Sequence, residues 1–520
     1  MKISIKFRKK IYSGFFLLSV VMFLIASGCR KDENPSPEIP PNTIDLDLFS
    51  AKLKGFNLQG KFDVFWSNNG FSEEDFIVLS DLGFNFVRLP LDYLAYTEWG
   101  DWNRILENEV TEIDQAVEWG EKYNVHVCIN LHRAPGYSVN KSGPIPANQQ
   151  VDLWTSKSTQ DAFVSHWNYF ASRYKDVPAE ELSFNLLNEP DETDEVNYVN
   201  IMSAAIDKIH SHNPNRVIFV DGLQYGNELI MSLKNARNII QAIHAYEPFT
   251  LTHYKASWVE GSDGWPIPFW PMIDISNYLY GPWKPEYQSS LGIEGEFTED
   301  SKVIVNIRQV SIESTLEIRL DEEVVLSKSF VCGPDPGEDW TEIIQTQWGY
   351  QNISNKDYSV TLPANDSRLT ISNAGGDWMT YNRIIIQSGS GETTIIPGDN
   401  SWGSEQETIH IDADGKITNE DGKSLILSNL YRKLETARNE DIPVMIQEFG
   451  VHNQTPHDVT LAFLSDLVLI FNEFDAGYAL WNLEGSFGIL NSDRGDCNYE
   501  SYQGELLDRD MLDILKSSGF

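Results

Sequence analysis

Cysteine is scarce in this sequence, and its spacing excludes two common uses of the residue. The 520 residues include four cysteines, Cys29, Cys128, Cys332 and Cys497. They form no CxxC pair and no paired framework, so neither a zinc site of that kind nor a disulfide scaffold is predicted. The ten histidines include no HExxH or similar metal-binding pair. We therefore predict neither a catalytic metal nor a cofactor.

Positive charge is also in short supply. The chain has 39 Lys and Arg against 77 Asp and Glu, which gives a formal net charge of −38. Such a surface repels a phosphate backbone, so the composition argues against nucleic-acid binding but not against a neutral polymer. Aromatic residues are abundant, with 15 Trp, 21 Tyr and 26 Phe. Most of them should belong to the core, although Trp and Tyr rings also stack on sugars.

The first residues have the layout of an export signal. A basic start is followed by an apolar run from Ile11 to Ala26 and then by Ser27 and Gly28, as in secretory signals. The run is short for a membrane-spanning helix. Its Gly-Cys end resembles a bacterial lipoprotein signal, although Ala26 stands where such signals usually carry leucine. The resemblance implies a signal peptide over residues 1–28 and lipidation of Cys29.

The segment after Cys29 bears on where the protein would reside. Arg30 to Glu33 is charged and resembles the tag that sends some Gram-negative lipoproteins to the outer cell surface; a solvated tether is the alternative. Four prolines between residues 35 and 41 predict a stiff linker, which we place at 29–50. We expect an exported outer-membrane lipoprotein that contacts the membrane only through its lipid anchor.

From about residue 53, short apolar runs alternate with amphipathic segments. Apolar residues in the latter recur at helical spacing, as at Val110, Ile113 and Val117, and Ser72 with Asp75 predicts a capping box. Eight apolar runs predict strands: Lys54–Leu58, Phe84–Leu89, Val125–Leu131, Leu182–Leu187, Arg216–Val220, Ile239–His244, Val444–Glu448 and Gly477–Trp481. Eight such units predict an α/β fold, a (β/α)8 TIM barrel with its active site at the C-terminal ends of the strands.

The alternation stops between the sixth and seventh strands. Phe249 to Ser290 is rich in Trp and Pro, and residues 291–390 read as short strands between turns, a pattern that fits a β-sandwich. We therefore expect a catalytic barrel over 51–250 and 424–520, with an insertion over 251–423. The inserted β-sandwich either walls the cleft, which its two tethers favour slightly, or binds glycan. The aromatic residues considered for glycan binding are Trp340, Trp348, Trp378 and Tyr381.

Two glutamates follow buried strands, where a charge is costly without a purpose. Glu189 ends the fourth strand within Asn188-Glu189-Pro190, and Glu448 ends the seventh, so the two should face one another across the barrel. Retaining hydrolysis of a glycosidic bond needs such a pair, about 5–5.5 Å apart. A lone Asn-Glu-Pro is more simply a helix start with an acidic first turn, but the pair favours catalysis.

These motifs, in this order, resemble glycoside hydrolase family 5, the large cellulase family of retaining barrels. The resemblance covers residues 53–250 and 424–520. It implies that Glu189 is the general acid/base and Glu448 the nucleophile, with Arg88 holding Glu448 ionised. It also implies substrate-binding positions at Arg88, His132, Asn188, His244, Tyr246 and Trp481.

The expected function is that of a retaining endo-β-1,4-glucanase, a monomer acting on a β-glucan or a related plant or microbial polysaccharide. A β-mannanase stays open because the shared residues fix the reaction and not the sugar. Exo-action or β-1,3 cleavage also stays open, since the insertion could close one end of the cleft. A non-catalytic surface glycan-binding lipoprotein is the alternative of another class. It would have lost a carboxylate or its supporters, and none is missing here.

Overall fold

The computed structural model describes residues 44–139, 143–388, 391–398, 402–413, 415–420, 422 and 424–517. The predicted signal peptide, Cys29 and most of the predicted linker therefore lie outside the described residues. Among the described helices, none combines the length and apolar character that a bilayer crossing requires.

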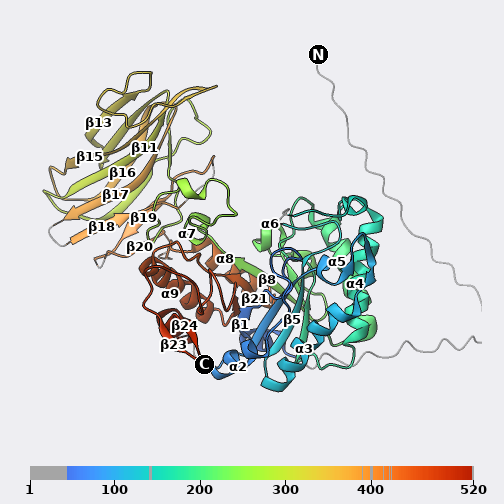
Figure 1. Ribbon diagram of the computed structural model, residues 1–520. Helices are drawn as coiled ribbons and strands as arrows, with labels where there is room; N and C mark the ends of the chain where they lie inside the picture. The colour runs from blue at the N-terminus through green and yellow to red at the C-terminus, as the bar shows by residue number, and fades with distance from the viewer. Residues whose placement is uncertain are drawn as a thin grey trace, which may run out of the picture. The chain divides into compact units, whose positions relative to one another are not determined.

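Eight parallel strands close into a barrel, which confirms the predicted (β/α)8 fold (Figure 1). In order around the barrel they are β1 (Lys54–Asn57), β2 (Phe86–Asp92), β5 (His126–Arg133), β6 (Leu182–Asn185), β7 (Ile218–Asp221), β8 (Ile239–Ala245), β21 (Val444–Phe449) and β22 (Gly477–Leu480). Each overlaps one of the eight expected strands. Parallel pairing of β1 with β22 closes the ring.

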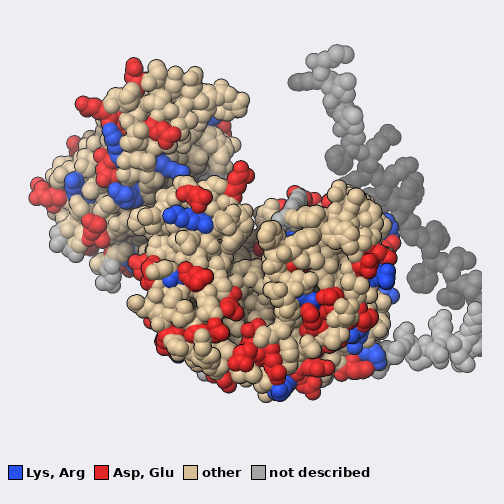
Figure 2. All heavy atoms as spheres, viewed as in Figure 1, with Lys and Arg blue, Asp and Glu red and all other residues tan. Residues whose placement is uncertain are grey.

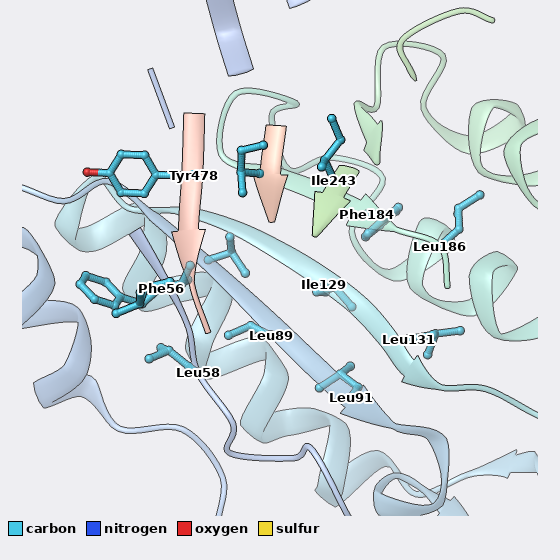
Figure 3. Packing of buried hydrophobic residues seen from close by; sticks show 14 of the residues in the cluster. Phe56, Leu58, Leu89, Leu91, Ile129, Leu131, Phe184, Leu186, Ile243 and Tyr478 are labelled. Carbon is cyan, nitrogen blue, oxygen red and sulfur yellow. The ribbon is translucent and has the colours of Figure 1, made fainter. Parts of the chain in front are cut away.

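Helices cover the outside of the barrel (Figure 1). They are α2 (Glu73–Asp81), α3 (Glu107–Tyr123), α4 (Lys157–Arg173), α5 (Glu195–His212), α8 (Ser428–Asn439), α9 (His457–Glu473) and α10 (Arg509–Lys516). Strand side chains such as Phe56, Leu89, Ile129 and Phe184 pack with the helices in one hydrophobic cluster (Figure 3). The Ser72 hydroxyl caps α2, but it accepts from the amide of Glu74 and not of Asp75.

Shorter elements lie in the loops around the barrel. They are β3 (Thr97–Glu98), β4 (Asp101–Ile105), α6 (Leu223–Gly226), α7 (Phe249–Thr252), β23 (Glu500–Tyr502) and β24 (Glu505–Leu507), with 3-10 turns η1 (Tyr93–Ala95), η2 (Ala147–Gln149), η3 (Met231–Leu233) and η4 (Ser262–Gly264). Between β7 and β8 the described chain has only α6 and η3, so this barrel unit lacks a full helix.

The N-terminal end of the barrel interior is apolar and closed. Phe86, Phe219 and Met445 form part of a buried cluster there, and Leu46 and Phe49 pack against it. The latter two belong to helix α1 (Leu46–Ala51), which the sequence analysis did not predict. This end of the barrel is therefore closed by side-chain packing.

A β-rich module occupies the chain between β8 and β21. One sheet contains β13 (Glu323–Val331), β12 (Glu313–Leu320), β16 (Asp366–Gly376), β10 (Leu291–Phe297), β19 (Thr408–Ile411) and β20 (Ile417–Thr418). The other contains β14 (Gln345–Thr346), β15 (Gly349–Thr361), β11 (Lys302–Ser311), β17 (Trp378–Ser388) and β18 (Gly391–Ile395), with β9 (Tyr278–Tyr280) paired to β17. Side chains of both sheets, such as Ile318 and Val305, share one hydrophobic cluster.

Three of the four aromatic residues considered for glycan binding are buried. Trp340 and Tyr381 belong to the core of the module, where they are 8% and 1% exposed, and Trp378 is 8% exposed. Trp348 is 72% exposed. These three rings therefore cannot stack on a sugar from solvent, because Trp340 and Tyr381 lie in the core and Trp378 is packed against Tyr278 and Trp402. On the face drawn in Figure 2, acidic side chains outnumber basic ones over barrel and module alike.

Candidate active site

The structure places all eight predicted site residues in the barrel strands or directly after them. Arg88 lies in β2, His132 in β5, His244 in β8 and Glu448 in β21, while Asn188 and Glu189 follow β6, Tyr246 follows β8 and Trp481 follows β22. A single series of contacts joins all eight. Parallel strands of a barrel end on one face, so residues far apart in the sequence meet there.

The two predicted catalytic glutamates lie close together. One oxygen of Glu189, one oxygen of Glu448 and a ring nitrogen of His244 are all within 4.8 Å of one another. Glu189 is 17% exposed and Glu448 is 3% exposed. Glu189 is thus partly open to solvent, whereas Glu448 is buried.

Arg88 is a fully buried cation, and each of its three nitrogens donates at least one hydrogen bond. Its Nη1 donates to Glu448 Oε1 at 2.5 Å and to Asn57 Oδ1 at 3.0 Å. Its Nε donates to Asn185 at 2.9 Å and its Nη2 to Asn188 at 2.7 Å. Fixed on three sides by asparagine oxygens, Arg88 holds Glu448 in one orientation.

Glu448 has a second partner and a perturbed pKa. The Tyr246 hydroxyl donates to Glu448 Oε2 at 3.1 Å. Burial raises the pKa of the Glu448 carboxyl above its usual range, and the cations His244 and Arg88 oppose that rise. We expected Arg88 to hold Glu448 ionised; here burial outweighs that effect, so Glu448 is a more basic carboxylate than an exposed one.

His244 lies between the two glutamates. Its Nδ1 is 2.9 Å from Glu189 Oε1 and 3.7 Å from Glu448 Oε2, and its Nε2 is 3.2 Å from Asp221 Oδ2. Burial alone would lower the pKa of His244, but the surrounding carboxylates, Glu448 and Asp221 foremost, outweigh it and raise the pKa to about 10. His244 is therefore a cation at neutral pH.

Asp221 is a site residue that the sequence analysis missed. It is fully buried at the end of β7, where Oδ1 accepts from Asn185 at 2.7 Å and Oδ2 from the backbone amide of Glu189 at 3.0 Å. Burial would raise the pKa of Asp221, but His244 and Arg88 outweigh it and hold the pKa below its usual value. Asp221 could have been found from the sequence, because it comes after a buried apolar run, as Glu189 and Glu448 do.

The backbone at Glu189 is held in an unusual conformation. Glu189 has a φ of +46°, in the left-handed region that non-glycine residues seldom adopt. The Asp221 carboxylate binds its amide, and the Tyr137 hydroxyl donates to its carbonyl at 2.6 Å. Both bonds stabilise a turn that directs the side chain toward His244.

Trp481 completes the group through ring contacts. Its ring centroid lies 5.4 Å from that of His132 and 5.5 Å from that of Phe62. Asn188 Nδ2 lies 3.4 Å from His132 Nε2. Burial lowers the pKa of His132 well below its usual value, with Arg88 and Arg133 acting in the same direction, so His132 is neutral. Trp481 is half-buried and offers part of its ring to a ligand.

Two sets of side chains in the described residues could hold a cation. One is the Glu189, His244 and Glu448 set just described, and the other is His457, Cys497 and Asp508, whose ligand atoms also lie within 4.8 Å of one another. The prediction that no catalytic metal is needed therefore stays a prediction.

A cavity of about 270 Å³ lies near the Glu189 backbone, but neither Glu189 nor Glu448 lines it. Its lining includes Tyr137, which bonds Glu189, together with Arg133, Asp63 and Tyr93. Arg133 pairs with Asp63 at 2.8 Å, and both side chains are largely buried. The arrangement as a whole is a (β/α)8 barrel with two neighbouring carboxylates at the C-terminal ends of its strands, one buried and one partly exposed.

Comparison with known proteins agrees with this description. Residues 44–268 match the family described as Cellulase (glycosyl hydrolase family 5). Endoglucanase C of Acetivibrio thermocellus is 30% identical over 196 residues, which are 37% of this chain and 54% of the relative. Endoglucanase 3 of Fibrobacter succinogenes is 29% identical over 337 residues, 56% of this chain and 47% of the relative. The chain thus spans about half the length of these relatives, and the family match supports glycoside hydrolase family 5 for residues 44–268, which include six of the eight barrel strands.

Solved structures show the likeness of the fold. A crystal structure of a glycoside hydrolase aligns with 90% of this chain and 99% of its own, with a TM-score of 0.57 and 24% identity. A cellobiose complex of Thermotoga maritima Cel5A aligns with 91% of this chain and 99% of its own, with a TM-score of 0.50 and 15% identity.

Proposed function

We propose that this protein is a retaining endo-β-1,4-glucanase that hydrolyses a β-glucan in polysaccharide catabolism. The observation that carries the proposal is the carboxylate spacing: oxygens of Glu189 and Glu448 lie within 4.8 Å of one another. A retaining enzyme needs about 5–5.5 Å, whereas an inverting enzyme needs about 6.5–9.5 Å to admit a water molecule. The names of the relatives support glucan as the polymer.

In the first step Glu448 is the nucleophile and Glu189 the acid. The Glu448 carboxylate attacks the anomeric carbon, the bond from that carbon to the leaving oxygen breaks, and this oxygen takes the proton of Glu189. The products are a glycosyl ester of Glu448, an ionised Glu189 and the released chain end. The burial that raises the pKa of Glu448 also makes it the better nucleophile.

In the second step Glu189 acts as the base. It takes a proton from water, the water oxygen bonds to the anomeric carbon, and the Glu448 ester bond breaks. Two inversions restore the original anomeric configuration. Both glutamates return to their starting forms.

His244 makes the exchange of charge between the glutamates favourable. With Arg88 and His244 as cations, and Asp221 and Glu448 as anions, the cluster is neutral when Glu189 carries a proton. In the glycosyl ester the negative charge has moved from Glu448 to Glu189. Because His244 Nδ1 lies 3.7 Å from Glu448 and 2.9 Å from Glu189, one cation stabilises the charge in both positions.

The remaining predicted residues would bind the sugar at the cleavage point. Asn188, held by Arg88 at 2.7 Å, is placed to bind the 2-hydroxyl, and Trp481 to stack under the ring. His132 is neutral and can accept or donate a hydrogen bond. Tyr246 keeps Glu448 aligned for attack.

A β-1,3-glucanase or an exo-acting enzyme is the second candidate. The protein named Glucan 1,3-beta-glucosidase 2, from Wickerhamomyces anomalus, is 30% identical over 182 residues, 34% of this chain and 40% of the relative. The catalytic geometry is common to both linkages, so the surrounding loops would decide between them.

We also propose that the protein is exported and anchored to the outer membrane through a lipid on Cys29. The support is the sequence of the first 33 residues. Metabolic labelling with radioactive palmitate would mark the full-length protein, and Cys29→Ala should remove the label. A labelled Cys29→Ala variant would overturn the proposed anchor.

The activity is tested on a panel of polysaccharides. The chain lacking its first 29 residues would be incubated with carboxymethylcellulose, barley mixed-linkage glucan, xyloglucan, glucomannan, galactomannan and laminarin, with reducing ends counted and products sized. Release from a β-1,4-glucan, with the β-anomer formed first in the proton NMR spectrum, is expected. Cleavage of mannans or laminarin alone would replace the substrate, and first formation of the α-anomer would overturn the retaining mechanism. Binding without any cleavage would favour the non-catalytic alternative.

A further inference from the structure

The β-rich module has a second aromatic group, which lies outside its core. In the pairing of β9 with β17, Trp378 stands opposite Tyr280 and Thr380 opposite Tyr278. The intervening Met379 and Leu279 belong to the hydrophobic core. Side chains alternate along a strand, so Tyr278, Tyr280, Trp378 and Thr380 share the opposite face of the sheet.

Trp402 packs on this face. Its ring centroid lies 5.6 Å from Tyr278, 5.2 Å from Tyr280 and 6.0 Å from Trp378. The Tyr287 ring lies 6.2 Å away, and all four rings are nearly perpendicular to that of Trp402. We call these five residues the Trp402 platform.

The platform packs four rings around one tryptophan that is itself partly exposed to solvent. Trp402 is 47% exposed, whereas Trp378 and Tyr280 are buried. The Tyr280 hydroxyl accepts the amide of Gly403 at 2.7 Å, which ties the neighbouring backbone to the same face. A ring fixed before binding loses little side-chain entropy when a ligand stacks on it.

Polar groups without partners lie next to the platform. Thr380 Oγ1, Asn277 Oδ1 and Gln406 Oε1 are buried and make no hydrogen bond within the described part of the chain. Asn277 lies two residues before the core residue Leu279, so it faces the core, and Gln406 Nε2 donates to the Tyr278 carbonyl at 2.7 Å. Of the three, only Thr380 shares the face of the platform, so its hydroxyl is the unpaired group nearest to a ligand bound there.

The chemistry of the patch fits a sugar chain. Lys284 Nζ lies 5.5 Å from the Trp402 ring centroid, so a flat apolar surface adjoins a hydrogen-bond donor. A β-linked glucose unit has the matching form, with an apolar face and hydroxyls at its edge. A neutral polymer also meets no repulsion from a chain of net charge −38.

We propose that the Trp402 platform is a second glycan-binding site, which takes a β-glucan chain. This inference rests on the proposed function in one respect, the identity of the polymer. Because the module and the barrel belong to one chain, a polymer held at the platform raises the local concentration of cleavable bonds at the barrel.

The test compares two exposed tryptophans of the same module. The background is Glu448→Gln, which keeps the polymer intact, and the variants are Trp402→Ala and the matched control Trp348→Ala. Trp348 is 72% exposed at the turn between β14 and β15. Retardation of each full chain is measured in native gels that contain barley mixed-linkage glucan. Turnover of a short aryl-cellooligosaccharide is measured with Glu448 restored.

We expect Trp402→Ala to weaken polymer affinity by about threefold to tenfold, as loss of one ring contact would, and Trp348→Ala to leave it unchanged. Trp402→Phe should retain part of the affinity, and thermal unfolding checks that each variant is folded. Turnover of the short substrate should stay within about twofold for all, since it reaches only the barrel.

Three results would overturn the platform as a glycan site. Equal retardation of the Trp402→Ala and Trp348→Ala variants would do so. The platform would also be overturned if no chain were retarded while the short substrate was still cleaved. That result would leave the proposed function intact. Concentration-dependent self-association lost only in Trp402→Ala, measured by sedimentation without glucan, would assign the patch to a second copy of the chain.

Discussion

The two ends of the barrel interior are built from the same eight strands, but they have opposite characters. At one end Phe86, Phe219 and Met445 form an apolar cluster against helix α1. At the other end Arg88 and His244 are buried among carboxylates. Packing closes the first end and contributes stability, whereas the buried charges at the second remain there only because each is paired. One strand can therefore contribute to stability through its N-terminal residues and to the active site through its C-terminal residues.

Removal of the two catalytic carboxylates should have the largest effect, and it should fall on activity. Glu448→Gln should lower kcat by at least about 10⁴-fold, because the nucleophile is lost, and Glu189→Gln by about 10²–10⁴-fold, because proton transfer is lost. Initial rates on the polymer that the wild type cleaves would show both effects. Thermal unfolding of each variant would show whether the loss belongs to the site or to the fold.

Azide separates the two roles. A small anion can attack the glycosyl ester without a base, so azide should restore turnover to Glu189→Ala and yield the β-glycosyl azide. With Glu448→Ala, azide attacks the substrate directly and yields the α-azide. If the two variants gave the products the other way round, the assigned roles would be exchanged.

At the apolar end the effect should fall on stability alone. Phe219→Ala should lower the free energy of unfolding by about 3–5 kcal/mol, because it leaves a cavity in a closed core. Phe219→Leu, the conservative control, should cost less than about 1.5 kcal/mol. Urea unfolding gives these values, and kcat of the folded protein should stay near that of the wild type. A large fall in kcat without a fall in stability would contradict the separation of the two ends.

Asp221 contacts His244 and the Glu189 amide but not the reacting atoms. Its substitution therefore tests whether a buried charge affects catalysis through His244. Asp221→Asn keeps the shape and, with its oxygen toward that amide, one acceptor, but it loses the acceptor for Asn185 and removes a charge that helps to raise the pKa of His244. We expect kcat to fall by about 10–100-fold and its alkaline limb to move to lower pH. The control Asp176→Asn changes an aspartate that is 87% exposed. It should alter neither kcat nor the pH dependence of kcat. An unchanged pH profile with a reduced kcat would make the role of Asp221 purely structural.

The sequence predicted the part of the barrel that follows from local pattern. All eight strands were found because each is a buried apolar run, and the two glutamates because each follows such a run. Helix α1 was missed because it is six residues long and has no full apolar stripe. Its role comes from Leu46 and Phe49 meeting the end of the barrel, which is a tertiary contact.

The β-rich module and the active site contain features that local sequence pattern could not predict. Strand β15 (Gly349–Thr361) is long, but its polar residues alternate with few apolar ones, so it was not expected. Trp378 and Trp402 are 24 positions apart, and their rings meet through a tertiary contact on the face that β17 shares with β9. The pKa of His244 likewise depends on carboxylates from three other strands.

The smallest expected effect is a pH dependence of stability that only the charged end should have. The pKa of His244, about 10 in the folded protein, lies above the value of about 6.5 in an unfolded chain. Its charged form therefore stabilises the fold fully below about pH 6.5, and this contribution is lost as the pH rises toward 10. Urea unfolding at pH 6.5 and 8.0 should show a fall in the wild type that is larger by about 1–2 kcal/mol than in His244→Asn. Phe219→Leu removes no charge, so it should keep the wild-type slope. An equal slope in His244→Asn would mean that the carboxylates hold His244 by hydrogen bonding and not by its charge.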